Sequence, residues 1–200
     1  MDAQDWDARY ASAELVWGGR PNRWVEAELA EHPPSQALDL ACGEGRNALW
    51  LAGRGWRVTA VDFSAVALEK GRTLESAQDL AAPRIDWVCA SALDYRPAQP
   101  VDLALLCYLQ VSAGERRSAV VNAAGALAPG GVLLVIAHDS SNLHEGTGGP
   151  QEPGVLYTAA DVSADLDGSG LVIDRAEAVL RPVDGAPRAA IDALLRAHRL

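Results

Sequence analysis

Two carboxylates and two glycines in the first third of the chain have the spacing of a nucleotide-binding site. The stretch ALDLACGEGRN (residues 37–47) contains an apolar run that reaches Asp39 and continues into a loop with Gly43 and Gly45. Glycines let a backbone adopt positive φ and approach a ligand closely where a helix begins. Nineteen residues after Gly43 a second apolar run ends at Asp62. A carboxylate at that spacing can accept the two hydroxyls of a ribose.

The charge of Asp39 distinguishes between the two cofactors that such a loop can hold. Residues 43–48 match the pattern G-x-G-x-x-A, which is typical of dinucleotide binding with a pyrophosphate at the helix N-terminus. A carboxylate beside that site would repel the pyrophosphate, whereas it would attract the ammonium and sulfonium groups of S-adenosylmethionine. We therefore expect S-adenosylmethionine. A nicotinamide dinucleotide and a tight turn without any ligand are the alternatives.

Strand-like and helix-like segments alternate along the first 139 residues and would position this loop. The predicted strands are residues 36–42, 56–63, 85–91, 101–109 and 131–139, and the predicted helices are residues 47–55, 64–80 and 113–128. Residues 101–109 are almost continuously apolar, as a parallel strand covered on both faces must be. The helix at 64–80 has Ser64 as its N-cap, and a Pro-Gly-Gly turn follows the helix at 113–128. The alternation predicts helices layered on a mostly parallel sheet.

The last third of the chain does not continue the strand–helix alternation. Residues 140–154 are rich in Gly, Pro and Ser and leave the end of the fifth strand, the edge where open α/β sheets bind ligands. A short helix is expected at 158–168, followed by runs at 171–183 and 188–199 that we expect to pair as an antiparallel hairpin. In the second run, apolar positions alternate with polar ones: Ile191, Ala193, Leu195 and Ala197 against Asp192, Arg196 and His198. A terminal helix is the alternative for that run.

These elements predict one α/β domain over residues 1–200, with a Rossmann-like, doubly wound sheet. The sheet would have seven mostly parallel strands and a C-terminal antiparallel hairpin. Residues 35–200 would form this core, and residues 1–34, with three of the six tryptophans, would form a cap of one or two helices.

Composition limits the partners of the chain. A net charge of −10 disfavours nucleic acid and anionic membranes, because both are bound through clustered Lys and Arg. A small-molecule acceptor is expected instead. The three cysteines form no C-x-x-C or Cys/His pairing, so we expect reduced thiols, no metal site and a cytoplasmic protein. No signal peptide is expected from the acidic start, and the apolar run GGVLLVIA is too short to span a bilayer. Nothing in the sequence indicates the oligomeric state.

The chain resembles the class I S-adenosylmethionine-dependent methyltransferases. LDLACGEGRN resembles their first motif, D-x-G-x-G-x-G, and VDFS resembles their second. LAPGG before VLLVIA resembles the turn that precedes their fifth strand. Within this superfamily, WDARY…VWGGRPN followed by CGEGRNALWLA looks most like the small bacterial tellurite-resistance and thiopurine-type methyltransferases. The resemblance implies methyl transfer from S-adenosylmethionine to a small nucleophile, such as a thiol or a selenium or tellurium oxyanion.

The resemblance also implies a set of cofactor contacts, position by position: Tyr10, Asp39, Ala41, Gly43, Gly45, Asp62, Phe63, Ser91, Ala92 and Cys107. In this set Asp62 would bind the ribose hydroxyls, Phe63 would lie along the adenine, and Ser91 would bond the adenine amino group. Two positions depart from the family pattern. Ala41 replaces the first glycine of the motif, and Ser91 replaces an acid by a weaker, uncharged acceptor.

The acceptor is expected beside the end of the fourth strand and residues 138–154. Tyr108 and His138 are the candidate catalytic residues there, His138 as a base or acceptor anchor and Tyr108 as a hydrogen-bonding or wall residue. Arg20 and Arg46 are candidate contacts for an oxyanion. The resemblance implies a lid built partly from three aromatic residues, Trp6, Tyr10 and Trp17. A non-catalytic protein that binds S-adenosylmethionine is a further alternative, motivated by the departures at Ala41 and Ser91. The absence of an evident catalytic dyad does not count against methyl transfer, because soft nucleophiles need little base.

Overall fold

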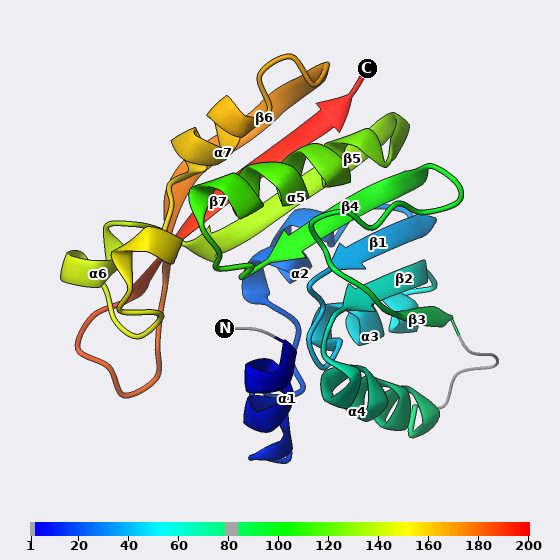
Figure 1. The fold of residues 1–200 in the computed structure, drawn as a ribbon. Helices are drawn as coiled ribbons and strands as arrows, with labels where there is room; N and C mark the ends of the chain where they lie inside the picture. The colour runs from blue at the N-terminus through cyan, green and yellow to red at the C-terminus, as the bar shows by residue number, and fades with distance from the viewer. Residues whose placement is uncertain (1–2, 79–83) are drawn as a thin grey trace.

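The computed structural model describes residues 3–78 and 84–200, which form one seven-stranded sheet flanked by helices (Figure 1). The strand order is β3-β2-β1-β4-β5-β7-β6. The strands are β1 (Gln36–Leu40), β2 (Arg57–Asp62), β3 (Ile85–Cys89), β4 (Val101–Cys107), β5 (Leu127–His138), β6 (Leu171–Arg181) and β7 (Ala190–Arg199). The helices are α1 (Ala3–Ala11), α2 (Arg23–Leu29), α3 (Arg46–Gly53), α4 (Ala65–Ser76), α5 (Ala113–Gly125), α6 (Asn142–Glu145) and α7 (Ala159–Asp165), with a 3₁₀ turn η1 (Pro153–Val155).

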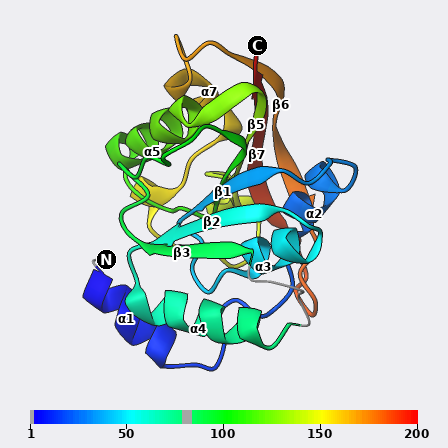
Figure 2. The same ribbon diagram turned by 90° about the vertical axis from the view of Figure 1, so that its right-hand side faces the viewer.

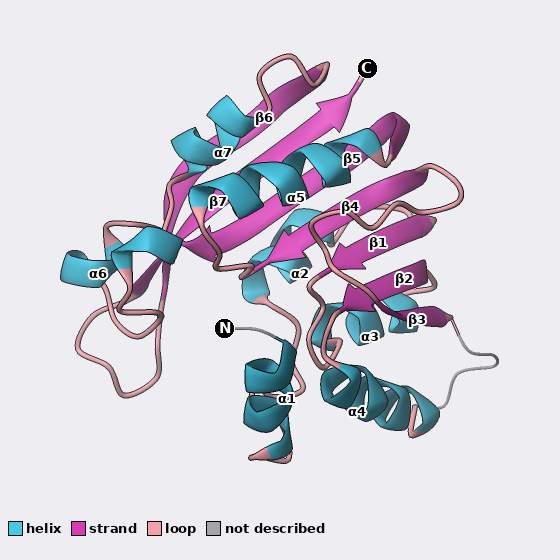
Figure 3. Cartoon of the chain, in the orientation of Figure 1, coloured by secondary structure: helices cyan, strands magenta, loops and turns pink. Residues whose placement is uncertain are grey.

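The first five strands are parallel, and β7 pairs antiparallel with both β5 and β6. Strand order reverses between β1 and β4, which are neighbours although β2 and β3 lie between them in sequence. At such a reversal the chain leaves neighbouring strands in opposite directions, which opens a crevice beyond their carboxyl ends. The arrows of β1 and β4 in Figure 3 point toward the side on which α1 lies. The predicted doubly wound sheet with its hairpin is confirmed.

The central strands bury side chains on both faces. Along β4, Leu103 and Leu105 pack on one face, while Ala104 and Leu106 pack on the other. The first face is covered by α2 and α3, and the second by α5 and α7, so the sheet lies between two helical layers (Figure 2). This double burial is the reason that these strands read as continuous apolar runs.

Local signals in the sequence set the starts of the helices. The side chain of Ser64 caps α4 by accepting the amide of Ala67 at 3.1 Å. Ser112 and Glu115 form a reciprocal capping box at α5, and Thr158 and Asp161 form another at α7. Among the described residues, no helix is long and apolar enough to cross a membrane.

Three details of the predicted elements are wrong or untested. The helix predicted at 113–128 ends at Gly125, because Leu127 already pairs with Val101 as the first residue of β5. The segment 140–154, predicted as a loop, contains the short helix α6 and the start of η1. The last two positions of the helix predicted at 64–80 lie outside the described residues.

A tryptophan on β3 joins the glycine loop to α4. A Cβ built on Gly45 would lie 2.2 Å from the Trp87 ring, and one on Gly71 would lie 2.4 Å from it. The indole nitrogen of Trp87 donates to Glu75 at 2.8 Å, which fixes the ring in this position. Trp87 therefore requires glycine on both elements that it touches.

We expect Gly71→Ala to destabilise the fold by about 1–3 kcal/mol, because the added methyl group overlaps the Trp87 ring. Chemical denaturation measures the change. The control is Gly114→Ala in α5, where no atom lies within 4 Å of the added Cβ. Equal stability of the two variants would show that the Trp87 ring can move away from the added methyl group without a loss of unfolding free energy.

Candidate functional site

Asp39 is buried in β1, and neither carboxylate oxygen forms a hydrogen bond of normal geometry with a described residue. It lies between Ala60 of β2 and Leu105 of β4, and only 1% of its surface is exposed. Burial, and to a lesser degree the charge of Asp62, raise the pKa of Asp39 to about 7, although the charge of Arg46 and the backbone amide of Ala48 lower it. A buried carboxylate without a partner is costly, so it points to a cationic ligand group.

Asp62 is held at the adjacent strand end by backbone amides. Its Oδ2 accepts the amide of Gly43 at 2.8 Å, and its Oδ1 accepts the amide of Ser64 at 2.9 Å. Burial raises the pKa of Asp62, whereas these two amides lower it. Asp62 thus joins the glycine loop to the start of α4. Each oxygen keeps a lone pair that can accept a further hydrogen bond.

The glycine loop turns through three residues with positive φ. Ala41 has φ of 58°, Gly43 of 57° and Gly45 of 78°. Gly45 is the N-cap of α3, and its carbonyl accepts the amide of Leu49 at 2.8 Å. At Ala41 the left-handed conformation places a Cβ against the following backbone, which costs about 1–2 kcal/mol. The departure from the glycine pattern at this position is therefore a strained one.

Protein side chains fill the space beside both loop glycines. The ring of Trp87 occupies the space of a Cβ at Gly45, and the hydroxyl of Tyr10 lies 2.7 Å from a Cβ built at Gly43. These contacts give a packing reason for glycine that the sequence pattern did not reveal. A cofactor role of the two glycines stays a prediction.

The segment that follows α1 is fastened to the glycine loop through Glu44. This buried carboxylate accepts the amide of Val16 at 2.9 Å and the Nζ of Lys70 at 3.2 Å. The same Nζ donates to the carbonyls of Tyr10 and Ala13, each at 2.5 Å. Glu44 and Lys70 together hold residues 10–17 against α4 and the loop.

The aromatic residues predicted as a lid do cluster. The Trp6 ring lies 5.5 Å from that of Tyr10 and 6.4 Å from that of Trp17, centroid to centroid. The indole nitrogen of Trp17 donates to the Tyr10 hydroxyl at 3.3 Å. Figure 1 shows α1 beyond the carboxyl ends of β1 and β4. The cluster lies beside Gly43, and its role as a lid stays a prediction.

A second buried carboxylate, Asp192 of β7, organises the other half of the crevice. Its Oδ2 accepts hydrogen bonds from Trp24 Nε1 at 3.0 Å, Tyr108 Oη at 2.9 Å and Arg181 Nε at 2.8 Å. His138 lies opposite Asp192 in the strand register, with its Nδ1 3.6 Å from Oδ1. The run of alternating apolar and polar residues is a strand, as predicted, and Asp192 is 0% exposed within it.

Tyr108 and His138, the candidate catalytic residues, lie side by side. Their rings stack with centroids 4.7 Å apart, and Tyr108 has a positive φ of 61°. Burial and the charge of Asp192 raise the pKa of Tyr108 far above its usual range, so its hydroxyl stays protonated. Burial lowers the pKa of His138, although Asp192 raises it, and the ring is neutral at pH 7. Tyr108 is thus a donor, and His138 is the group able to accept a proton.

The remaining predicted contacts are distributed along the strand ends. Cys107 ends β4 beside Tyr108, and burial raises the pKa of its thiol to about 12, so it is not a thiolate nucleophile. Phe63 follows Asp62 with its side chain exposed, and its contact with adenine stays a prediction. Ser91 and Ala92 follow β3, and the Ser91 hydroxyl accepts the amide of Leu93 at 3.2 Å. This bond stabilises the turn and leaves the hydroxyl proton free to bond elsewhere.

Several residues of the site carry no motif in the sequence: Trp24, Glu44, Lys70, Trp87, Arg181 and Asp192. The only sequence signal for the role of Asp192 is that an acid lies between apolar residues of a predicted strand.

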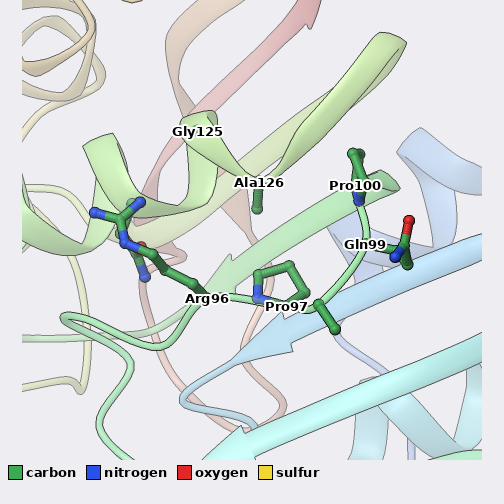
Figure 4. A pocket seen from close by; sticks show the side chains of 8 residues that line it. Arg96, Pro97, Gln99, Pro100, Gly125 and Ala126 are labelled. Carbon is green, nitrogen blue, oxygen red and sulfur yellow. The ribbon is translucent and has the colours of Figure 1, made fainter.

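The hollow shown in Figure 4 lies at the other edge of the sheet. It has a volume of about 180 Å³ and is bounded by Arg96, Pro97, Pro100, Gly125 and Ala126. These residues precede β4 and β5, whereas Asp39 and Tyr108 lie toward strand ends. A second hollow, of about 370 Å³, lies between α3 and the end of α4. No three potential metal ligands converge anywhere in residues 3–78 and 84–200.

The charge of Asp39 should make the stability of the fold depend on pH. Its pKa is higher in the folded chain than in the unfolded chain, so the unfolding free energy falls as pH rises from about 4 to about 7. Asp39→Asn should reduce this slope and make the chain more stable than the wild type at pH 8. Denaturation at several pH values measures both, with Asp167→Asn on the surface as control. An unchanged slope in Asp39→Asn would contradict the assignment.

At Ala41, unlike at an ordinary helical position, we expect substitution by glycine to stabilise the fold. Ala41→Gly relieves the left-handed strain but adds unfolded-state entropy, and the balance should stabilise the fold by about 0.5–1 kcal/mol. The same change at Ala164, an exposed helical position, should destabilise it by about 1 kcal/mol. Thermal and chemical denaturation distinguish the two signs. Destabilisation by both substitutions would mean that Ala41 is not strained.

Comparisons with known proteins show what this chain is similar to. Residues 37–131 match the family described as "Methyltransferase domain". Glycine N-methyltransferase of Rattus norvegicus is 32% identical over 166 residues, which are 76% of this chain and 56% of that protein. Trans-aconitate 2-methyltransferase of Paracidovorax citrulli is 32% identical over 126 residues, which are 60% of this chain and 45% of that protein. The chain thus spans about half the length of the curated relatives it matches.

The fold is shared with solved structures over nearly the whole chain. The N-methyltransferase NodS from Bradyrhizobium japonicum WM9, solved in complex with S-adenosyl-L-homocysteine, superposes with a TM-score of 0.74 at 18% identity. The superposition covers 97% of each chain. Residues 37–131 are thus similar to the methyltransferase domain, and the whole chain shares the fold of this N-methyltransferase.

Proposed function

We propose that this protein transfers the methyl group of S-adenosylmethionine to a small-molecule acceptor. The observation that carries the proposal is Asp39, a buried carboxylate whose oxygens form no hydrogen bond of normal geometry with the described residues and are approached only by the backbone amide of Ala48. The ammonium of the cofactor supplies both the charge and the donors that Asp39 lacks. A pyrophosphate at the same place would add a second anion, which disfavours the nicotinamide dinucleotide.

The rest of the crevice fits the other parts of this cofactor. Asp62 has lone pairs available for the ribose hydroxyls, and the positive-φ loop lets the backbone approach the ligand. Phe63 is exposed beside Asp62 and would lie along the adenine, with Ser91 and Ala92 at its edge. In this arrangement Tyr10 and the other aromatic residues of the cap would cover the bound cofactor.

The chemistry needs alignment and the exclusion of water more than acid–base catalysis. The cofactor supplies a methyl group bonded to a sulfonium: the acceptor's lone pair forms the new bond, and the electron pair of the broken bond stays on sulfur. The cap and the aromatic rings beside Cys107 would exclude water from this line. An acceptor that releases a proton could pass it to His138, which is neutral, while Tyr108, whose hydroxyl donates to Asp192, would serve as a wall.

The acceptor class remains part of the proposal. The names of the two curated relatives describe methylation of glycine and of trans-aconitate, which are small polar molecules. They support a small acceptor here. The finer resemblance to tellurite-resistance and thiopurine-type methyltransferases favours a thiol or a selenium or tellurium oxyanion. A non-catalytic cofactor-binding protein is the second candidate, motivated by the strained Ala41 and the uncharged Ser91.

Calorimetric titration with S-adenosylhomocysteine and with NADH tests the cofactor. We expect binding of S-adenosylhomocysteine only, and a loss of about 10-fold or more in affinity for Asp62→Ala, since two hydrogen bonds to a charged acceptor are removed. Asp102→Ala, which alters a carboxylate at the opposite edge, is the control. Binding of NADH alone would exclude the proposal.

Methyl-transfer assays then separate the enzyme from the non-catalytic candidate. The acceptors to be screened are thiols, selenite, tellurite and small phenols. Cofactor binding without turnover on every acceptor would favour the non-catalytic protein.

A further inference from the structure

The two oxygens of the buried Asp192 carboxylate have unequal partners. Oδ2 accepts three short hydrogen bonds, from Trp24 at 3.0 Å, Tyr108 at 2.9 Å and Arg181 at 2.8 Å. From the described residues, Oδ1 accepts only the second bond of Arg181, at 3.4 Å. The Nδ1 of His138 lies 3.6 Å from Oδ1, just beyond hydrogen-bond distance. One oxygen of the acid is thus saturated, and the other faces a histidine.

The His138 ring is held in this position by its neighbours. It stacks on the Tyr108 ring with centroids 4.7 Å apart, and the backbone amide of His138 donates to Gln110 Oε1 at 2.9 Å. Gly149 also lies against the ring, because a Cβ built there would be 3.0 Å from both Cγ and Nδ1. These contacts keep the ring beside Asp192.

The two nitrogens of the His138 ring have different surroundings. Nδ1 is buried, faces Asp192 and forms no hydrogen bond of normal geometry with a described residue. Nε2 has no hydrogen bond to the described part of the chain either, and 14% of the His138 side chain is exposed. A carboxylate oxygen can only accept, so the proton of the neutral ring belongs on Nδ1 and the lone pair belongs on Nε2.

We propose that Asp192 is a positioning residue for His138, which takes a proton from the methyl acceptor through Nε2. This inference rests on the proposed function and adds the chemical class of the acceptor. The nucleophilic atom of that acceptor carries a proton, as in a hydroxyl, an amine or a thiol. Oxyanions of selenium and tellurium have no such proton to release and would make no use of the pair.

The transfer step balances with these groups. The acceptor's lone pair bonds to the methyl carbon, the carbon–sulfur bond breaks with its electron pair left on sulfur, and the acceptor's proton moves to Nε2. The imidazolium that forms lies beside the Oδ1 of Asp192, whose negative charge stabilises it. Contacts of this kind are often long in the free protein and shorten when substrate is bound.

The charges that face His138 come from three strands or strand ends. Burial lowers the pKa of His138, the charge of Asp192 on β7 raises it, and that of Arg181 on β6 lowers it. Tyr108, after β4, stays neutral because burial raises its pKa. Removing the charge of Asp192 must therefore lower the pKa of His138 further.

Nitrogen NMR of protein that contains nitrogen-15 histidine tests the tautomer without any acceptor. The chain has four histidines, and His138→Gln identifies the signals of His138. At pH 8 we expect the proton on Nδ1 in the wild type. In Asp192→Asn the three donors to Oδ2 retain the amide oxygen, so the amide NH₂ group faces Nδ1 and the proton moves to Nε2.

Methyl-transfer assays measure the consequence for turnover. The probes are 2-mercaptoethanol, phenol and glycine, with selenite and tellurite as acceptors that have no proton to give at pH 8. For Asp192→Asn we expect kcat to fall about 100-fold or more, since Nε2 then carries a proton. The acid limb of the kcat–pH profile should move to lower pH, and affinity for S-adenosylhomocysteine should be unchanged.

Asp165→Asn is the matched control. Asp165 is also a buried acid paired with an arginine, Arg116, at 2.6 Å, but it lies in the layer of α5 and α7. Its variant should keep the wild-type tautomer of His138 and the wild-type pH profile, even where the unfolding free energy falls. Circular dichroism verifies the fold of each variant, and the wild-type tautomer decides the point if Asp192→Asn is misfolded.

Three outcomes would overturn the inference. The first is a wild-type His138 with its proton on Nε2, and the second is an Asp192→Asn variant with the tautomer and kcat of the wild type. The third is methylation of selenite or tellurite alone. All three leave the proposed function intact. Absence of S-adenosylhomocysteine binding to the wild-type chain would instead refute the proposed function, whatever the tautomer of His138.

Discussion

The site of this protein depends on the high cost of burying a carboxylate in the low-dielectric interior of a sheet. Asp39 and Asp192 are both buried at its carboxyl edge, but their surroundings differ. Asp192 receives donors from Trp24, Tyr108 and Arg181, so its charge is satisfied within the fold. Asp39 forms no hydrogen bond of normal geometry with the described residues, and only the charge of Arg46 and the amide of Ala48 offset its burial. One carboxylate therefore stabilises the fold, and the other is the one that we propose binds the cofactor.

This difference divides the crevice into two functional halves. The half around Asp192 joins α2, β4, β5, β6 and β7, and it needs no ligand to be rigid. The half around Asp39 consists of the glycine loop, Asp62 and the cap, which Glu44 and Lys70 hold together. Tyr108 and Arg46 lie at the boundary, where the Tyr108 ring contacts both Arg46 and Arg181. A methyl group moving from cofactor to acceptor would cross this boundary.

Much of the fold could be predicted from the sequence, because its signals are local. Continuous apolar runs indicated the two-sided strands, and Ser64 indicated the start of α4. The end of α5 was mispredicted because Leu127 is recruited by a distant partner, Val101, and not by its neighbours in sequence. The roles of Asp192 and Trp87 were missed for the same reason, because the residues that they contact lie far away along the chain.

Because Trp87 packs on Gly45, the presence of this glycine is weak evidence that such a chain binds a ligand. Gly45 must stay glycine as long as Trp87 packs on it, whether or not a ligand ever binds. A descendant of this protein that lost its cofactor would keep the glycine under selection for folding alone. Folding does not favour Asp39 in the same way, because a poorly paired buried acid lowers the stability of the protein without a ligand. In the evolutionary record of this fold, the persistence of that acid is thus the better marker of a working site.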